Sequence, residues 1–235
     1  MFAVNRRTAG IAALVVLAFA VAGCGDKEPE QRKAFMAFLQ NRILDKQGVR
    51  VPKPTEAETK SFGIYADHYA IITGFNAEMD TAMAGPYRIA QNAAPRTVQE
   101  LLERRQEVAA MRDALSKSVE AMQATLAAAQ SRREALRQPA DLKQVYTAAY
   151  DRSVTAPALA FLATVPVAIE NLTLSLQLAD YLDKNRAAVK VTGSAIDTRN
   201  ARVRAEVNRM MNELNAHRQK LNEARQRLRI VVEGK

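Results

Sequence analysis

The chain has 235 residues, 48% of them hydrophobic, and a formal net charge of +9. That length is sufficient to bury a sizeable core. A single cysteine, Cys24, excludes a disulfide within the chain, so the fold must be held together by its core alone.

The first 24 residues have the pattern of a secretory signal that ends at a lipidated cysteine. A basic opening with Arg6 and Arg7 precedes an apolar run over 9–20. This run of about 15 residues is shorter than the roughly 20 that a membrane-spanning helix needs. Val-Ala-Gly-Cys at 21–24 resembles the lipobox of bacterial lipoproteins, which implies cleavage before Cys24 and attachment of acyl chains such as palmitate to it. The alternative is an ordinary buried thiol.

Removal of the signal peptide, residues 1–23, leaves a lipoprotein domain over 24–235 that we expect to be single and helical. Its net charge is +7, because the signal carries two arginines and no acidic residue. Residues 25–29 form a tether that spans at most about 17 Å, so the domain should lie close to its membrane, facing the periplasm. Gly25, rather than aspartate, follows the cysteine, which favours the outer membrane over the inner membrane.

A basic domain held there by acyl chains on Cys24 would meet anionic lipid or cell-wall polymer before it met nucleic acid. We therefore expect the membrane as one partner and an envelope protein, lipid or wall polymer as another. We expect no nucleic acid.

Short motifs along the chain resemble one bacterial protein family. The most specific are Cys-Gly-Asp-Lys-Glu at 24–28 and Gln-Arg-Lys-Ala-Phe at 31–35. Weaker similarities lie at 69–71, 141–143 and 155–157. These motifs resemble a Gram-negative lipoprotein family catalogued as a domain of unknown function. The resemblance implies a lipoprotein and assigns no activity.

Helical periodicity begins near residue 30 and continues to about 46, where Gly48 supplies a stop. Thr-Glu-Ala-Glu at 55–58 is a capping box that begins a second helix. We predict that this helix ends at Gly-Pro, 85–86, and that a loop follows over 87–96. Its aromatic and methionine row is interpreted as core, with a ligand pocket as the alternative. The row consists of Phe62, Tyr65, Tyr69, Ile72, Met79 and Met83.

The middle of the chain predicts the longest helix, over about 97–138. A capping signature begins at Thr97, and a seven-residue apolar period continues to Pro139, which corresponds to about 60 Å. Arg105 and Arg112 interrupt this period at core positions, where their charged ends need solvent or a polar partner.

The residues after Pro139 predict two more helices and a hairpin. Thr-Ala-Pro at 155–157 separates the two helices, and Pro166 predicts a kink or break near Thr164. The alternating run near 188–198, with Gly-Ser at its centre, predicts a small β-hairpin. Because an isolated hairpin is marginal in water, it should lean on the helices.

The long C-terminal helix, predicted from about 198, holds most of the basic excess. Residues 199–235 carry ten Lys and Arg against four Glu. A solvated helix surface is one explanation. If the long helix from Thr97 were its neighbour, however, no acid would meet the basic flanks. We therefore predict contact with an anionic surface, such as lipid headgroups, through Arg218, Lys220, Arg225 and Arg227.

The sequence assembles no catalytic or metal-binding group. His68 and His217 are the only histidines, and neither belongs to a helical metal-binding pair. We interpret them as local polar partners of Asp67 and Glu213, and we expect no cofactor. The sequence thus predicts an all-α, elongated helical bundle with a non-enzymatic structural or interaction role. The alternative is a carrier of a small apolar molecule or lipid in a pocket of the bundle.

Overall fold

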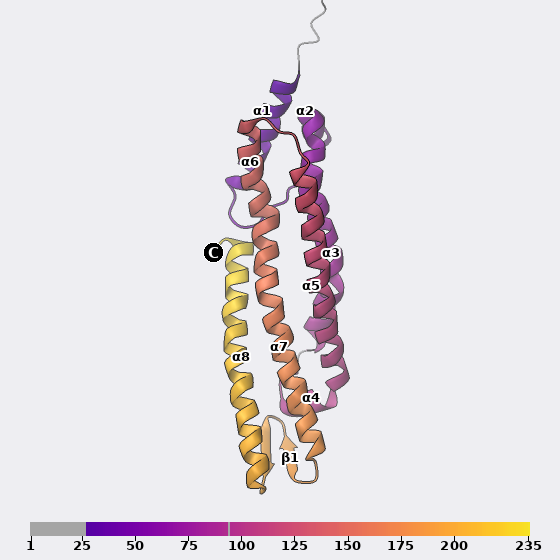
Figure 1. Cartoon of the computed structure of the whole chain (residues 1–235), viewed down its shortest axis with the longest axis vertical. Coiled ribbons are helices and arrows are strands. Elements are labelled where there is room, and N and C mark those ends of the chain that lie inside the picture. The colour runs from indigo at the N-terminus through magenta and orange to yellow at the C-terminus, as the bar shows by residue number, and fades with distance from the viewer. Residues whose placement is uncertain (1–26, 94) are drawn as a thin grey trace, which may run out of the picture.

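The computed structural model describes residues 27–93 and 95–235, so the predicted signal peptide and Cys24 lie outside the described residues. The side chains of Met83 and 85–94 are also outside the description. The described chain is an elongated, mostly helical bundle with one β-hairpin, which confirms the predicted fold class (Figure 1). Its elements are α1 (Glu28–Leu39), η1 (Gln40–Leu44), α2 (Glu56–Phe62), η2 (Gly63–Tyr65), α3 (Ala66–Ala93), α4 (Val98–Glu103), α5 (Arg105–Glu134), α6 (Ala140–Tyr150), η3 (Asp151–Thr155), α7 (Ala156–Lys184), β1 (Val189–Thr192), β2 (Ala195–Thr198) and α8 (Ala201–Glu233).

The long helices form a row. α3 packs on α5, α5 packs on α7, and α7 packs on α8, so that α3 and α8 lie at its edges (Figure 1). α6, η3 and α7 are one continuous helix from Ala140 to Lys184. By length and composition alone this helix could cross a membrane. In the bundle it is the inner helix, because α5 and α8 pack against it.

Aromatic rings fill the core at the end of the row where α1 begins, which we call the tether end. Phe35 stacks on Tyr65 with 5.9 Å between ring centroids, and Phe38 meets Tyr69 edge-on at 5.1 Å. The Tyr69 hydroxyl donates to the carbonyl of Pro52 at 2.6 Å. The row that the sequence assigns to the core is buried wherever its side chains are described: Phe62, Tyr65, Tyr69, Ile72 and Met79.

The predicted hairpin closes the opposite end. β1 and β2 pair antiparallel with Val191 opposite Ile196, and Gly193 lies in the turn with φ +61°. The Gln99 amide of α4 donates to the Gly193 carbonyl at 2.9 Å, and the Gly193 amide donates back to Gln99 Oε1 at 3.1 Å. The apolar face of the hairpin packs on α7 and α8, as its marginal stability requires.

Both predicted helix starts carry their caps. Thr55 and Glu58 form the reciprocal capping box, and Thr97 accepts from the amide of Glu100. The predicted long helix over 97–138 is present as α4 and α5. The two segments are joined at Arg104, whose φ of −109° departs from helical geometry.

The predicted stop at Gly85-Pro86 is wrong. α3 continues to Ala93, so the expected loop over 87–96 shrinks to the residues before α4. Proline removes one backbone hydrogen bond and crowds the preceding turn, but it need not end a helix. Packing of α3 on α5 offsets that cost.

The predicted separation at Thr155-Ala156-Pro157 is also wrong, because the π-helical turn η3 carries the chain from α6 into α7 without a gap. Pro157 takes the helical donor away from the Ser153 carbonyl. Asn76 of α3 supplies a substitute, since its Nδ2 donates to that carbonyl at 3.3 Å. α7 also continues through the exposed Pro166, so of the two predicted outcomes near Thr164, a kink or a break, the break is absent.

A single arginine joins the two π-helical turns. Arg152 in η3 donates to the carbonyls of Leu44 at 2.8 Å and Gly48 at 3.1 Å, and also to that of Lys46. η1 ends at Leu44. The guanidinium therefore satisfies carbonyls that the end of a helix leaves without donors.

The loop that follows η1, which contains Gln47 and Val49, also holds the C-terminal end of α8. The Val49 amide donates to the Val232 carbonyl at 2.9 Å, and Gln47 Nε2 donates to the Gly234 carbonyl at 2.7 Å. Gly48 and Gly234 have φ of +72° and +75°. A Cβ on Gly48 would lie 2.6 Å from the Val232 oxygen, so both conformation and space require glycine there.

Replacing Arg152 with Met should lower the free energy of unfolding by about 2–4 kcal/mol, because charged hydrogen bonds to three carbonyls are lost while the apolar stem is kept. Urea unfolding of residues 25–235 measures this, because that range contains every core residue that the structure describes. Arg137→Met, on an exposed arginine, is the matched control and should change stability by less than about 0.5 kcal/mol. Equal effects of the two substitutions would show that the Arg152 bonds contribute nothing specific.

Candidate interaction surface

α8 packs on α7. The long helix from Thr97, considered above as a possible neighbour of α8, is therefore not the helix that it packs against. The hairpin is a short connection, which makes the helices before and after it antiparallel neighbours. The apolar seam of α8 faces α7 and is buried at Val203, Val207, Leu214, Leu221 and Ala224. The other sides of α8 carry mostly polar residues, with Ile230 and Val232 exposed near its C-terminal end.

Acidic residues of α7 pair with specific partners. Glu170 Oε2 lies 3.4 Å from His217 Nδ1, so the partner of His217 is across the helix pair. The predicted contact of His217 with Glu213 is wrong, because Glu213 pairs with Arg209 at 3.0 Å. Asp180 pairs with Arg105 of α5, whose side chain is partly exposed and does not occupy the predicted core position.

The four predicted surface cations are all exposed, and none of them has an ion pair within the described ranges 27–93 and 95–235. By contrast, Arg209 on the same helix is held by Glu206 at 2.7 Å. A fifth cation, Arg229, is equally exposed and was missed by the sequence argument. The sequence could have identified Arg229, because it lies four residues after Arg225 and therefore on the same flank of the helix. The cationic set therefore comprises Arg218, Lys220, Arg225, Arg227 and Arg229.

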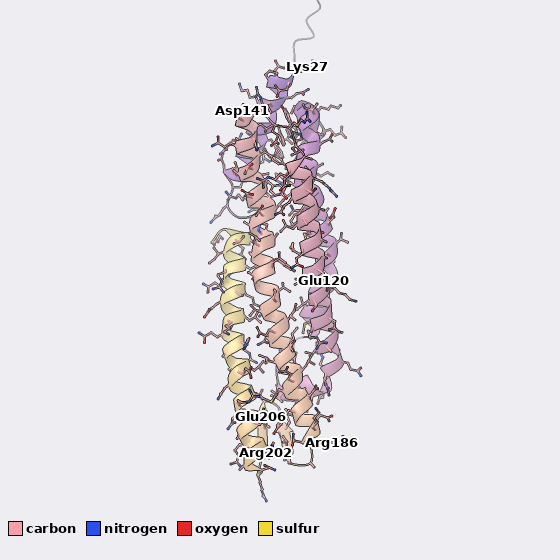
Figure 2. All side chains as sticks on the ribbon, in the orientation of Figure 1. Lys27, Glu120, Asp141, Arg186, Arg202 and Glu206 are labelled. Atoms are coloured by element: carbon pink, nitrogen blue, oxygen red, sulfur yellow. The ribbon has the colours of Figure 1, made fainter. Side chains whose placement is uncertain are left out.

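This cationic set lies far from the tether end. The Thr164 hydroxyl donates to the Ala224 carbonyl at 3.2 Å, which places Ala224 beside Thr164. Thr164 is 24 residues along the helix from Ala140, or about 36 Å. Figure 2 shows Lys27 and Asp141 at one end of the molecule and Arg186 and Arg202 at the other. The cations thus occupy the middle of the rod, several Debye lengths of about 8 Å from its tether end.

His68 is buried beside the aromatic core, remote from His217 in the fold. Gln138 Nε2 lies 3.0 Å from His68 Nδ1, and the Tyr146 hydroxyl donates to the His68 carbonyl at 2.8 Å. Burial lowers the pKa of His68, against a smaller opposing effect of Asp67, so the ring is neutral and accepts from Gln138. Asp67 thus affects His68 only by raising its pKa through charge, and the hydrogen-bond partner of the His68 ring is Gln138.

Nothing in these surroundings points to catalysis. Burial and the hydrogen bond to Glu28 raise the pKa of Tyr65 to about 12, which keeps its hydroxyl protonated. Across the described part of the chain, no group of three His, Cys, Asp or Glu residues is placed to hold a metal ion.

The described fold defines the class of protein: an elongated, mostly helical bundle with one small β-hairpin. The chain belongs to the family described as "Protein of unknown function (DUF3053)", which it matches over residues 11–229. The uncharacterized protein YiaF of Escherichia coli (strain K12) is 30% identical over 212 residues, covering 89% of each chain. YiaF of Shigella flexneri gives the same figures. No solved structure matches the chain significantly.

The stability of the protein should fall more steeply between pH 7.5 and pH 5.5 than that of a His68→Gln variant. The lowered pKa means that the unfolded chain binds a proton which the folded chain rejects, so acidification through about pH 6.5 favours unfolding. Urea unfolding of both proteins at the two pH values measures the difference. The same loss in both would show that His68 does not carry the effect.

Proposed function

We propose that this protein is a lipid-anchored component of the cell envelope, with residues 1–23 as signal peptide and Cys24 as the acylated residue. The apolar run and the lipobox-like sequence support the anchor. The described chain supports the geometry, because α1 begins at the extreme end of the rod. In this proposal 24–235 is one domain facing the periplasm, and Gly25 favours the outer membrane.

The role of the domain is an interaction role and not a catalytic one. The observation that carries this is the cationic set on α8: five exposed cations without acidic partners, on an edge helix. Like charges on one helix repel, so the set is stabilised by an external anion. The partner is thus an anionic component of the envelope.

The carrier hypothesis receives less support. A carrier encloses most of its ligand in an apolar cavity. Around Tyr65 and Tyr69 the space is filled by the rings of Phe35 and Phe38. The hollow next to Tyr69 is open to solvent and does not enclose a ligand, although apolar side chains such as Val49, Val51 and Pro54 make up much of its lining.

With the anchor at one end of the rod, the orientation of the molecule determines how far the α8 cations lie from the membrane. A tether at the end of the rod lets an upright molecule hold α8 well above the headgroups, whereas a molecule lying flat brings the cations to them. Each cation close to an anionic membrane contributes up to about 1 kcal/mol of binding, which salt screens. An upright molecule instead offers the same cations to anions farther from the membrane.

Replacing Cys24 with Ala should abolish stable membrane association, because acyl attachment requires the sulfur and two or more chains are needed for firm anchoring. Fractionation of cells that express the full chain, with metabolic palmitate labelling, measures the loss. A processed Cys24→Ala protein that stayed in the membrane pellet would contradict the anchor.

Gly25→Asp is the matched control for that experiment. It keeps the cysteine, and the expected result is a labelled, membrane-bound protein that moves from the outer to the inner membrane fraction. If the parent and the Gly25→Asp variant both fractionated with the inner membrane, the outer-membrane proposal would fail while the anchor remained intact.

A further inference from the structure

The outward side of α8, opposite its seam, is a line of amide side chains. Its members recur at alternating spacings of four and three residues, so they follow one line along the helix for about 27 Å. All six are exposed. They are Asn208, Asn212, Asn215, Gln219, Asn222 and Gln226.

The cationic set borders this amide line on both sides. At 100° per residue, Arg218, Arg225 and Arg229 fall on one flank, and Lys220 and Arg227 fall on the other. One face of α8 thus combines neutral groups that both donate and accept hydrogen bonds with a border of positive charge, interrupted by the exposed carboxylate of Glu223. We call this combination the amide–arginine face.

Helix stability does not explain the amide line. Asparagine is among the weaker helix formers, and packing does not dictate outward positions. α5, a helix of similar length, contains no asparagine. Within the described chain only Gln219 of the six has a side-chain hydrogen bond, a long one of 3.4 Å to Glu223. Residues that lower helix propensity and make few hydrogen bonds in return indicate a functional surface.

We propose that the amide–arginine face binds the anionic glycan polymer of the cell wall, laid along α8. The inference rests on the envelope location proposed above. Amide groups can exchange hydrogen bonds with sugar hydroxyls, and guanidinium groups pair with carboxylates of the polymer. Successive amides stand about one helical turn, or about 5.4 Å, apart, which is comparable to the length of one pyranose unit.

Other occupants fit this face less well. A helix that lies in a membrane carries large apolar side chains where α8 carries amides. A second copy of α8 would bring equal rows of positive charge together, which opposes pairing. Nucleic acid shares the negative charge, but the proposed location keeps it away.

The test uses residues 25–235, which contain the whole described core. Co-sedimentation with purified peptidoglycan sacculi measures glycan binding. Vesicles with and without anionic lipid, and duplex DNA, are the comparison probes. One variant removes the amides (Asn212→Ala, Asn215→Ala, Asn222→Ala), and one removes charge (Arg218→Gln, Lys220→Gln, Arg225→Gln, Arg227→Gln).

Matched controls place the same changes on other exposed positions. They are Gln106→Ala, Gln123→Ala and Gln130→Ala for the amides, and Lys117→Gln, Arg132→Gln, Arg137→Gln and Lys143→Gln for the charges. Circular dichroism and thermal unfolding verify the fold of each variant. Alanine at outward positions of α8 should preserve or raise helix stability.

The parent should bind sacculi in a salt-dependent manner, and both α8 variants should bind about tenfold more weakly, while the controls match the parent. The amide variant should keep the parent's response to anionic vesicles, since headgroups require only charge. Equal binding of parent and amide variant to sacculi would overturn the proposal, as would preference for vesicles or DNA, or no binding. The two proposals can fail separately. If the protein bound sacculi but its Cys24→Ala variant still remained in the membrane, the glycan inference would stand and the proposed anchor would fall.

Discussion

α7 packs between α5 and α8, and this contact determines which sides of the outer helices remain exposed. Because the long helices follow one another in a row, α8 has one helical neighbour rather than the two of a closed bundle. One apolar seam is enough to hold it. The remaining sides of α8 are therefore free to carry charge and amide groups without cost to the core.

α8 is also fixed near both of its ends, which makes its exposed face a rigid one. At its start, the hairpin is anchored on Gln99 of α4. At its end, Gly234 meets Gly48 in a loop whose carbonyls are held by Arg152. A face held in this way can bind an extended partner without first being ordered.

Local chemistry accounts for the parts of the fold that the sequence predicts well. The capping box at Thr55 and the Gly-Ser turn of the hairpin act within a few residues, so their signals can be read directly. The apolar residues that recur at helical spacing likewise include most of the buried residues, because a helix buries one apolar face.

The predictions that failed depend on residues far apart in sequence. Where the helix passes Pro157, Asn76 from another helix donates to the carbonyl of Ser153. His217 pairs with Glu170 only because α7 is the neighbour of α8. Arg152 shows no sequence signal at all, since its acceptors are carbonyls more than one hundred residues away. Cys24 lies outside the described residues, so its role stays a prediction.

In the proposed function, the exposed side of α8 is the surface through which an envelope protein binds its partner. Site-specific photo-crosslinking in intact cells tests this most directly, with a photoreactive residue at Asn215 or Asn222 of α8 and, for comparison, at Gln106 or Gln130 of α5. We expect adducts from the α8 positions alone, and we expect an enzyme that cleaves wall glycan to release them. Adducts from α5 alone, or equal adducts from both helices, would contradict the proposal.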